Sequence, residues 1–564
     1  MFKAPPLANR GTFAHRRWLV AVCVAVVSTP LLGAPQSDTR VADAAMRADT
    51  QAIRSLLQSG ADVNGAQGDG MTALHWAVMK DDGELARMLL QAGARATSAT
   101  RLGAYTPLLL AAANGNATLL ELLLRAGADS NSSTSNGTTA LMLAAASGRE
   151  DAVKLLLDRG ADPNRRENAR GETALMYAAA DNRPAVTRLL IERGADPSIA
   201  TIVVDLSKVD APRPALNADR QDTNRELIGT QGGMTALLFA ARQGNTETVK
   251  ALLDAGVDVN QVNPGDKTSP LLIAAINGHF DLASLLLDRG ANPNLASTAG
   301  ATPLYATLNL QWIPRSQYPQ PTAHTQQKTT YLDLMTKLLQ HGADPNARLT
   351  RKLWYTGYNF EHSGVDENGA TAFWRAAQAT DLAAMRLLVK SGADPTISPE
   401  VAGRRRRAPA ESRATSPNPA VVPRSGGAPS AVPRAANGDN EAPVNALLVA
   451  VGAGWFGNFH VNAPGSWMPA VKYLVEELGF DVNAADFRGY TALHYAAARG
   501  DDEMIVYLVS KGADVKAEGK DGVTVADMAN GHDARVQPFL DTIALLEKLG
   551  SRNNHNCLSC GRPR

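Results

Sequence analysis

Cysteine is scarce in this chain, with three among 564 residues. Cys23 lies in an apolar run near the N-terminus, which leaves Cys557 and Cys560 for the remainder of the chain. Two cysteines cannot build a disulfide-rich scaffold. The fold must therefore be held together by packing and hydrogen bonding.

Aromatic residues and net charge are also low. Aromatics make up 5% of the residues, while short Ala/Leu patterns recur, which favours stacked small helices over a few large cores. The formal net charge of +1 gives no overall attraction to nucleic acid or to an anionic membrane. Single cores stop growing near roughly 250–300 residues, so we expect several domains or an extended repeat array.

No apolar run at the N-terminus is long enough for a typical membrane span of about 20 residues. Arg10, Arg16 and Arg17 precede the apolar stretch Trp18–Val27. A basic segment followed by a short apolar one predicts a signal peptide, here over residues 1–34. We therefore expect export to the periplasm or the outside of a bacterial cell. The alternative is an uncleaved N-terminal anchor, and only then would the chain contact a membrane.

Internal periodicity is the strongest positive signal. Thr-Ala-Leu, Thr-Pro-Leu or a close variant is followed 21 residues later by Gly-Ala-Asp or a relative of it. Eight units share this offset, and they begin at Thr72, Thr106, Thr139, Thr173, Thr235, Ser269, Thr371 and Thr491. A motif that recurs at one fixed offset predicts a structural repeat.

Each part of the repeated unit has a physical role, as the unit at Thr139 illustrates. The Thr139 hydroxyl can cap a first helix, and Gly148 opens a tight turn. Residues 151–157 have apolar side chains at helical spacing and predict a second helix. Gly160 ends that helix in a left-handed conformation, and Asp162 begins a turn into a hairpin-like loop.

This order of Thr-Ala/Pro-Leu, Gly, Leu-Leu and Gly-Ala-Asp-x-Asn resembles the ankyrin repeat, here of an exported bacterial type. The resemblance implies an all-α ankyrin-repeat solenoid of about 11–12 helix-turn-helix units with short β-hairpin-like loops. Two weaker units stand at the ends. Ala42–Asn64 carries only the second half of the motif, and Thr524–Leu549 lacks the Gly-Ala-Asp.

The repeats do not run without interruption. We assign ankyrin repeats to residues 41–396, with insertions at 198–232, 310–330 and 349–368, and again to residues 443–550, including a C-terminal cap. Residues 398–442 are rich in Pro and Arg and predict a disordered loop, since such a segment buries little apolar surface. We interpret this arginine-containing loop as a solvated linker, so no nucleic acid is expected as a partner.

The polar tail 551–564 contains Cys557 and Cys560 at Cys-x-x-Cys spacing. The His that haem attachment would need is absent, and a zinc site lacks further ligands beyond His555. A local disulfide between Cys557 and Cys560, or pairing with another chain, is expected in an oxidising compartment. The histidines are scattered without metal or triad spacing. We therefore predict no enzyme, no cofactor and no metal.

Ankyrin arrays bind through the hairpin tips and the ends of the first helices, which line a concave face. By motif position, that face includes Met79, Lys80, Asn114, Ser147, Asp181, Arg242, Gln243, Asn277, Gln378 and Arg499. A second group of aromatics lies in irregular segments and consists of Trp312, Trp354, Tyr358, Trp455 and Trp467. These rings either form an exposed binding patch or pack on one another to fill irregular stretches of the array.

The sequence thus predicts a monomeric protein–protein interaction scaffold that binds an unidentified partner protein through the concave face and the aromatic insert loops. One alternative is an exported enzyme, or a redox or metal-binding protein, that uses the insert cluster or the C-terminal Cys-x-x-Cys. A further alternative is an effector delivered to a host cell.

Overall fold

The computed structural model describes residues 38–208, 228–313, 321–353, 367–399, 443–453, 462–531 and 537–555. The expected signal peptide, most of the predicted disordered loop, and Cys557 and Cys560 lie outside these residues. Across the described ranges, no helix has the length and apolar character needed to cross a membrane.

Along the chain, the described helices alternate between a first and a second helix, with twelve of each. The first helices are α2 (Arg40–Met46), α4 (Ala73–Met79), α6 (Pro107–Asn114), α8 (Ala140–Ser147), α10 (Ala174–Ala180), α13 (Ala236–Gln243), α15 (Pro270–Ile276), α17 (Pro303–Gln311), α19 (Ala372–Gln378), α21 (Ala446–Val451), α23 (Ala492–Arg499) and α25 (Val525–Ala529).

The second helices follow their partners after a short turn or an insertion. They are α3 (Thr50–Gln58), α5 (Gly83–Gln91), α7 (Ala117–Arg125), α9 (Glu150–Asp158), α11 (Pro184–Glu192), α14 (Thr246–Asp254), α16 (Phe280–Asp288), α18 (Tyr331–Gln340), α20 (Leu382–Lys390), α22 (Trp467–Lys472) continued by the π-helix η4 (Tyr473–Glu477), α24 (Asp502–Ser510) and α26 (Leu540–Leu549). The all-α repeat fold is thereby confirmed.

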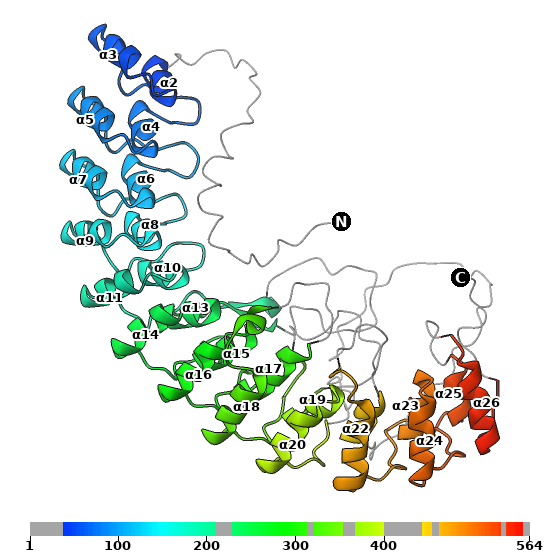
Figure 1. Ribbon diagram of the computed structural model, residues 1–564. Coiled ribbons are helices and arrows are strands. Elements are labelled where there is room, and N and C mark those ends of the chain that lie inside the picture. The colour runs from blue at the N-terminus through cyan, green and yellow to red at the C-terminus, as the bar shows by residue number, and fades with distance from the viewer. Residues whose placement is uncertain are drawn as a thin grey trace, which may run out of the picture. The chain divides into compact units, whose positions relative to one another are not determined.

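The structure divides into two compact units, with the boundary between Ala274 and Ala275 inside α15. In the first unit, α2, α4, α6, α8, α10 and α13 contact one another in succession, and α5, α7, α9, α11 and α14 form a parallel second row (Figure 1). In the second unit, α17, α19, α21, α23 and α25 repeat the arrangement, with α16, α18 and α20 in the second row. Within each unit, a helix pair therefore packs on its sequence neighbours.

The core lies between the successive pairs and is built from small and branched side chains. Leu108, Leu109, Ala111 and Ala112 of α6 have no exposed surface, and Ala140, Ala144 and Ala145 of α8 are equally buried. Alanine at the contact allows neighbouring helix backbones to approach closely. This packing explains why the chain needs so few aromatic residues.

The repeated threonine caps the first helix, as predicted. The Thr139 hydroxyl accepts a hydrogen bond from Met142 N at 3.3 Å, and Thr106, Thr235, Thr302 and Thr371 act in the same way. Gly160 adopts φ +81°, the left-handed conformation expected after the second helix.

A polar ladder joins successive repeats at the Asp-x-Asn positions. Asn164 donates from Nδ2 to Gly194 O at 2.9 Å and accepts from Asp196 N at 2.7 Å, so its amide binds the next repeat twice. The same pair of bonds is made by Asn64, Asn131, Asn294, Asn346 and Asn483. One residue type at one motif position therefore links each of these repeats to the next.

The insertion predicted at 198–232 begins as a short antiparallel ribbon. Strand β1 (Val204–Asp205) pairs with β2 (Thr230–Gln231), with Val204 opposite Gln231, and the 3₁₀ turn η1 (Leu206–Lys208) follows β1. A second 3₁₀ turn, η2 (Ala323–Gln326), precedes α18.

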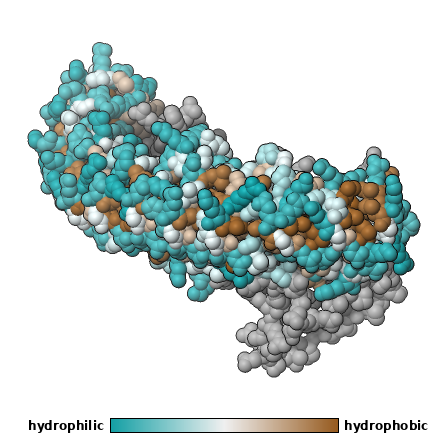
Figure 2. Space-filling view, turned by 60° about the horizontal axis from the view of Figure 1, so that its bottom comes forward, coloured by the Kyte–Doolittle hydropathy of each residue, from teal (hydrophilic) through white to brown (hydrophobic). Residues whose placement is uncertain are grey.

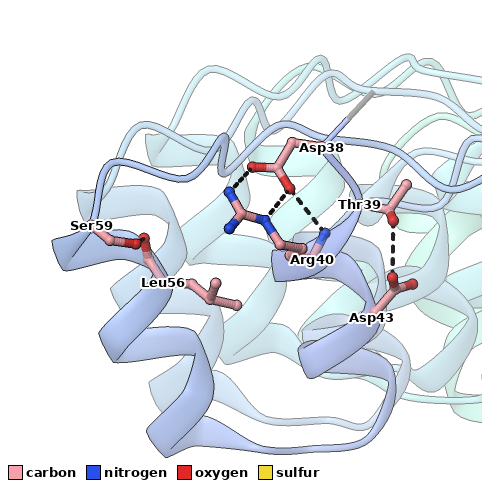
Figure 3. A network of polar contacts seen from close by, with 6 residues as sticks. All are labelled: Asp38, Thr39, Arg40, Asp43, Leu56 and Ser59. Carbon is pink, nitrogen blue, oxygen red and sulfur yellow. Dashed lines mark hydrogen bonds and ion pairs between the residues drawn. The ribbon is translucent and has the colours of Figure 1, made fainter. Parts of the chain in front are cut away.

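The N-terminal repeat has both helices, α2 and α3, although Ala42–Asn64 carries only the second half of the sequence motif. The sequence lacks the Thr-x-Leu signal, and other contacts take its place (Figure 3). Asp38 binds the Arg40 guanidinium at 2.8 Å, and Thr39 Oγ1 donates to Asp43 at 2.9 Å. The guanidinium beside Asp38 lowers the pKa of that carboxyl.

Removing one rung of the ladder tests its contribution. We expect Asn164→Ala to lower the free energy of unfolding by about 1–3 kcal/mol, because Gly194 O and Asp196 N each lose a partner. Urea unfolding followed by circular dichroism measures the change. Asn168→Ala is the matched control, since Asn168 is exposed on the same loop. Equal stability of the two variants would contradict a role for the ladder.

Candidate partner-binding surface

The helix-end positions predicted for partner binding lie where the first helices finish. Lys80 and Asn114 are exposed, and the other eight are half-buried: Met79, Ser147, Asp181, Arg242, Gln243, Asn277, Gln378 and Arg499. Their charge and size change from one repeat to the next. The structure therefore presents a non-repeating surface on a repeating frame.

Several of these side chains also make structural contacts, either with the preceding repeat or within their own helix. Asn114 Nδ2 donates to Val78 O of the preceding first helix at 3.2 Å, and Ser147 Oγ donates to Ala144 O at 2.7 Å. The guanidinium carbon of Arg242 lies 5.1 Å from the Phe239 ring centroid. These positions combine a structural contact with partial exposure.

Arg499 is the most enclosed of them, with a side chain that is 12% exposed. Its guanidinium carbon lies 3.3 Å from the centroid of the Trp467 ring, and Nη1 donates to Val451 O at 2.7 Å. Burial lowers the pKa of the arginine to about 10. Arg499 and Trp467 thus join α21, α22 and α23, and little of the guanidinium remains for a partner.

Trp312 belongs to a buried polar junction. Its Nε1 donates to Asp381 Oδ2 at 2.7 Å, and Tyr331 OH donates to the same oxygen at 2.8 Å. The other carboxylate oxygen, Oδ1, accepts from Ala384 N at 3.0 Å and caps α20. Burial and the neighbouring Asp381 charge raise the pKa of Tyr331. Asp381, which sequence reasoning missed, holds three elements together.

Arg375 completes this junction from α19. The residue is 3% exposed, and its Nε donates to Asn309 Oδ1 at 2.8 Å. Its Nη2 donates to the Trp312 carbonyl at 2.5 Å. A buried charge is stable only when its donors are satisfied, so this set of bonds fixes the end of α17 where the insertion begins. Trp312 packs inward here, while Trp354, Tyr358 and Trp455 lie outside the described residues.

The histidines in the Thr-x-Leu-His pattern are structural. In the C-terminal example, Thr491 N donates to His494 Nδ1 at 3.1 Å, and burial lowers the pKa of that imidazole to about 4. His75 makes the same bond to Thr72 at 3.2 Å. Both imidazoles stay neutral near pH 7 and serve as helix caps.

Metal-ligating side chains do not gather in the described part of the chain, where no group of three or more His, Cys, Asp or Glu residues could hold an ion. Figure 2 shows one face of the molecule, on which hydrophilic residues predominate and hydrophobic residues form bands between them. The exposed large hydrophobic residues among those described are Met46, Leu102, Ile202, Val203, Val204, Val262, Val506 and Leu540.

Family models match most of the helical regions. A model described as "Ankyrin repeats (3 copies)" matches residues 108–201, 215–306 and 434–519, and one described as "Ankyrin repeats (many copies)" matches residues 41–90. Together they cover more than half of the chain.

Similarity to individual curated proteins is local. The chain is 40% identical over 72 residues to the human "Ankyrin repeat and KH domain-containing protein 1", which is 13% of this chain and 3% of that protein. It is 31% identical over 99 residues to "Dauer abnormal formation protein 25" of Caenorhabditis elegans, or 18% of this chain and 24% of that protein. It is 33% identical over 94 residues to "Serine/threonine-protein kinase 12" of Arabidopsis thaliana, or 16% and 19%. The chain therefore spans less than a quarter of these relatives' length.

The junction around Asp381 gives a direct test of how the insertion is held. The two carboxylate oxygens of Asp381 accept hydrogen bonds from Trp312, from Tyr331 and from the backbone N–H that caps α20. The substitution Asp381→Asn leaves only one of these acceptor oxygens. We expect unfolding free energy to fall by about 1–3 kcal/mol in urea titrations, because a buried donor loses its acceptor.

Asp82→Asn is the matched control for this substitution. Asp82 caps α5 by accepting from Leu85 N at 2.9 Å, and asparagine caps helices as well as aspartate does. A loss no larger than that of the control would show that Asp381 acts only as a cap.

Proposed function

Because this chain belongs to the ankyrin-repeat proteins, whose repeats generally mediate protein–protein interaction, we propose that it is a scaffold that binds a partner protein. The observation that supports this most is the contrast between core and helix ends. The buried positions repeat the same Ala and Leu residues, whereas the helix ends vary from Lys80 to Asn114, Asp181 and Gln243. A surface that varies on a constant frame suits recognition of one particular partner.

The proposed binding surface consists of the helix ends together with the loops that connect successive pairs. Binding residues concentrate on loops that a rigid frame holds in place, because loop side chains are not needed to build the core. In this proposal the protein acts as a monomer and performs no chemistry on its partner.

The partner is expected to meet the protein after export. The basic residues Arg10, Arg16 and Arg17, followed by the apolar run Trp18–Val27, support a signal peptide over residues 1–34. Export places the binding surface in the periplasm or outside the cell.

Charge reversal at the helix ends tests the scaffold function. In pull-downs from the exported fraction, we expect the double variant Lys80→Glu with Asp181→Lys to recover at least about tenfold less partner than the native chain. The reason is that the substitutions remove contacts from the interface. Mass spectrometry of the captured proteins identifies the partner.

The matched control makes the same charge changes on second helices, with Lys154→Glu and Glu192→Lys, both at exposed positions. Circular dichroism shows whether each chain is folded. Equal recovery by the helix-end and control variants would move the binding site elsewhere. Failure of the folded native chain to capture any protein would contradict the scaffold function itself.

Fractionation tests the export proposal. A chain with its native N-terminus, produced in a bacterial host, should appear in the periplasmic or extracellular fraction with Pro35 as its first residue. Deleting Trp18–Val27 should retain the chain in the cytoplasm, because the apolar run is the part that the export machinery reads. Full-length chain in the membrane fraction would instead show an uncleaved anchor.

A further inference from the structure

Three of the exposed large hydrophobic residues are consecutive. Ile202, Val203 and Val204 are 46%, 40% and 42% exposed. Successive side chains of an extended segment point to opposite faces, so packing on one side would hide every second residue. Here all three side chains stay partly exposed, so neither face is fully covered. Three adjacent apolar side chains on a solvent-exposed ribbon mark a candidate interaction site.

The ribbon is firmly held at its base. Ile202 N donates to Arg170 O of the preceding loop at 2.8 Å, and Val204 pairs with Gln231 across the ribbon. Gly232 has φ +100°, and a Cβ there would lie 1.8 Å from Ile202 O, so only glycine permits this approach. The apolar residues are thus presented on a fixed element, which lowers the entropy lost on binding.

Cationic side chains border the apolar residues. The Arg166 guanidinium and the Ile202 side chain both approach Gly171, within 2.6 and 3.1 Å of where its Cβ would stand. The Arg170 side chain is 68% exposed and that of Lys208, at the end of η1, is 82% exposed. Guanidinium groups bind carboxylates with two parallel hydrogen bonds, which favours an acidic ligand.

Nearby carboxylates offset only part of this charge. Glu167 is 5% exposed, and its oxygens accept from the backbone N–H groups of Ala169, Arg170 and Glu172. The Glu167 carboxylate therefore stabilises the conformation of its own loop. Glu172 lies 3.8 Å from Arg170, and the Asp205 carboxylate lies 3.0 Å from Lys208. Among the described residues of the neighbouring loops, Arg165 and Lys267 are also exposed, which adds to the positive charge on this side of the ribbon.

We define the ribbon patch as Ile202, Val203 and Val204 together with Arg166, Arg170 and Lys208. We propose that this patch binds an extended acidic segment of the partner protein, an inference that rests on the proposed scaffold function. The partner's apolar side chains contact the three aliphatic residues, and its carboxylates, spaced between them, meet the flanking cations. An extended segment fits because a two-stranded ribbon offers a strand edge along which a peptide can lie.

Fluorescence anisotropy with the full chain tests this directly. The probe is a labelled peptide in which glutamate alternates with valine and leucine, and a second probe replaces each glutamate by lysine. We expect the acidic probe to bind and the basic probe to bind at least about tenfold more weakly, with acidic-probe affinity falling as salt rises.

Two variants separate the apolar and the charged contributions. Each variant should lower the affinity for the acidic probe by at least about tenfold. The first is the triple variant Ile202→Ser, Val203→Ser, Val204→Ser, and the second is the double variant Arg166→Glu, Arg170→Glu. Leu102→Ser, at another exposed loop residue that is 69% exposed, is the control and should bind as the native chain does. Circular dichroism verifies folding of each variant.

The remaining outcomes overturn the inference. They are equal binding by the serine variant, equal binding of the two probes, and no binding of the acidic probe. Tighter association with vesicles of phosphatidylserine, lost in the same variants, would assign the patch to a membrane surface instead. If a partner is captured by the native chain and equally by the serine variant, the scaffold function stands and the ribbon inference fails.

Discussion

The burial of small-residue helix faces between neighbouring pairs is the interaction on which the structure depends. A single pair such as α8 and α9 is too small to enclose its own Ala and Leu residues. Its core residues, such as Ala144 and Leu156, are fully buried in the stack, where α8 packs on α6 and α10 and α9 packs on α7 and α11. Stability is therefore approximately a sum of contacts between neighbours, and any segment that does not disturb those contacts can be inserted between pairs.

The polar contacts follow the spacing that this packing sets. Asn164 can bind Gly194 O and Asp196 N because the stacked helices hold the next loop at the right distance, and the other ladder asparagines repeat the geometry. Where an insertion follows α17, the bonds of Asp381 and Arg375 with Trp312 are added to the regular contacts. These buried polar groups hold the end of α17 in place beside the Ala and Leu packing.

The same constraint separates the core from the binding surface. Since packing fixes only the inward positions, the helix ends and loops are free to differ from one repeat to the next. Some helix-end residues serve both purposes, as Arg499 shows by binding Val451 O and the Trp467 ring. The ribbon of Ile202, Val203 and Val204 lies on an insertion, and its three aliphatic side chains remain 46%, 40% and 42% exposed. Its apolar exposure therefore points to a partner, not to a need of the fold.

The sequence alone predicts the fold class, the repeat positions and the capping residues. Thr139, Gly160 and their equivalents act locally, through the backbone within a few residues, so their spacing is visible in the chain. It did not indicate that Ala42–Asn64 forms both helices, that Trp312 packs on Asp381, or that Arg375 is buried. Those contacts join residues up to 69 positions apart, and only the stacking of the repeats brings them together. The exposure of the ribbon likewise depends on the tertiary structure. Val and Ile in an extended segment are as typical of a buried strand as of an exposed one, so the sequence does not distinguish the two.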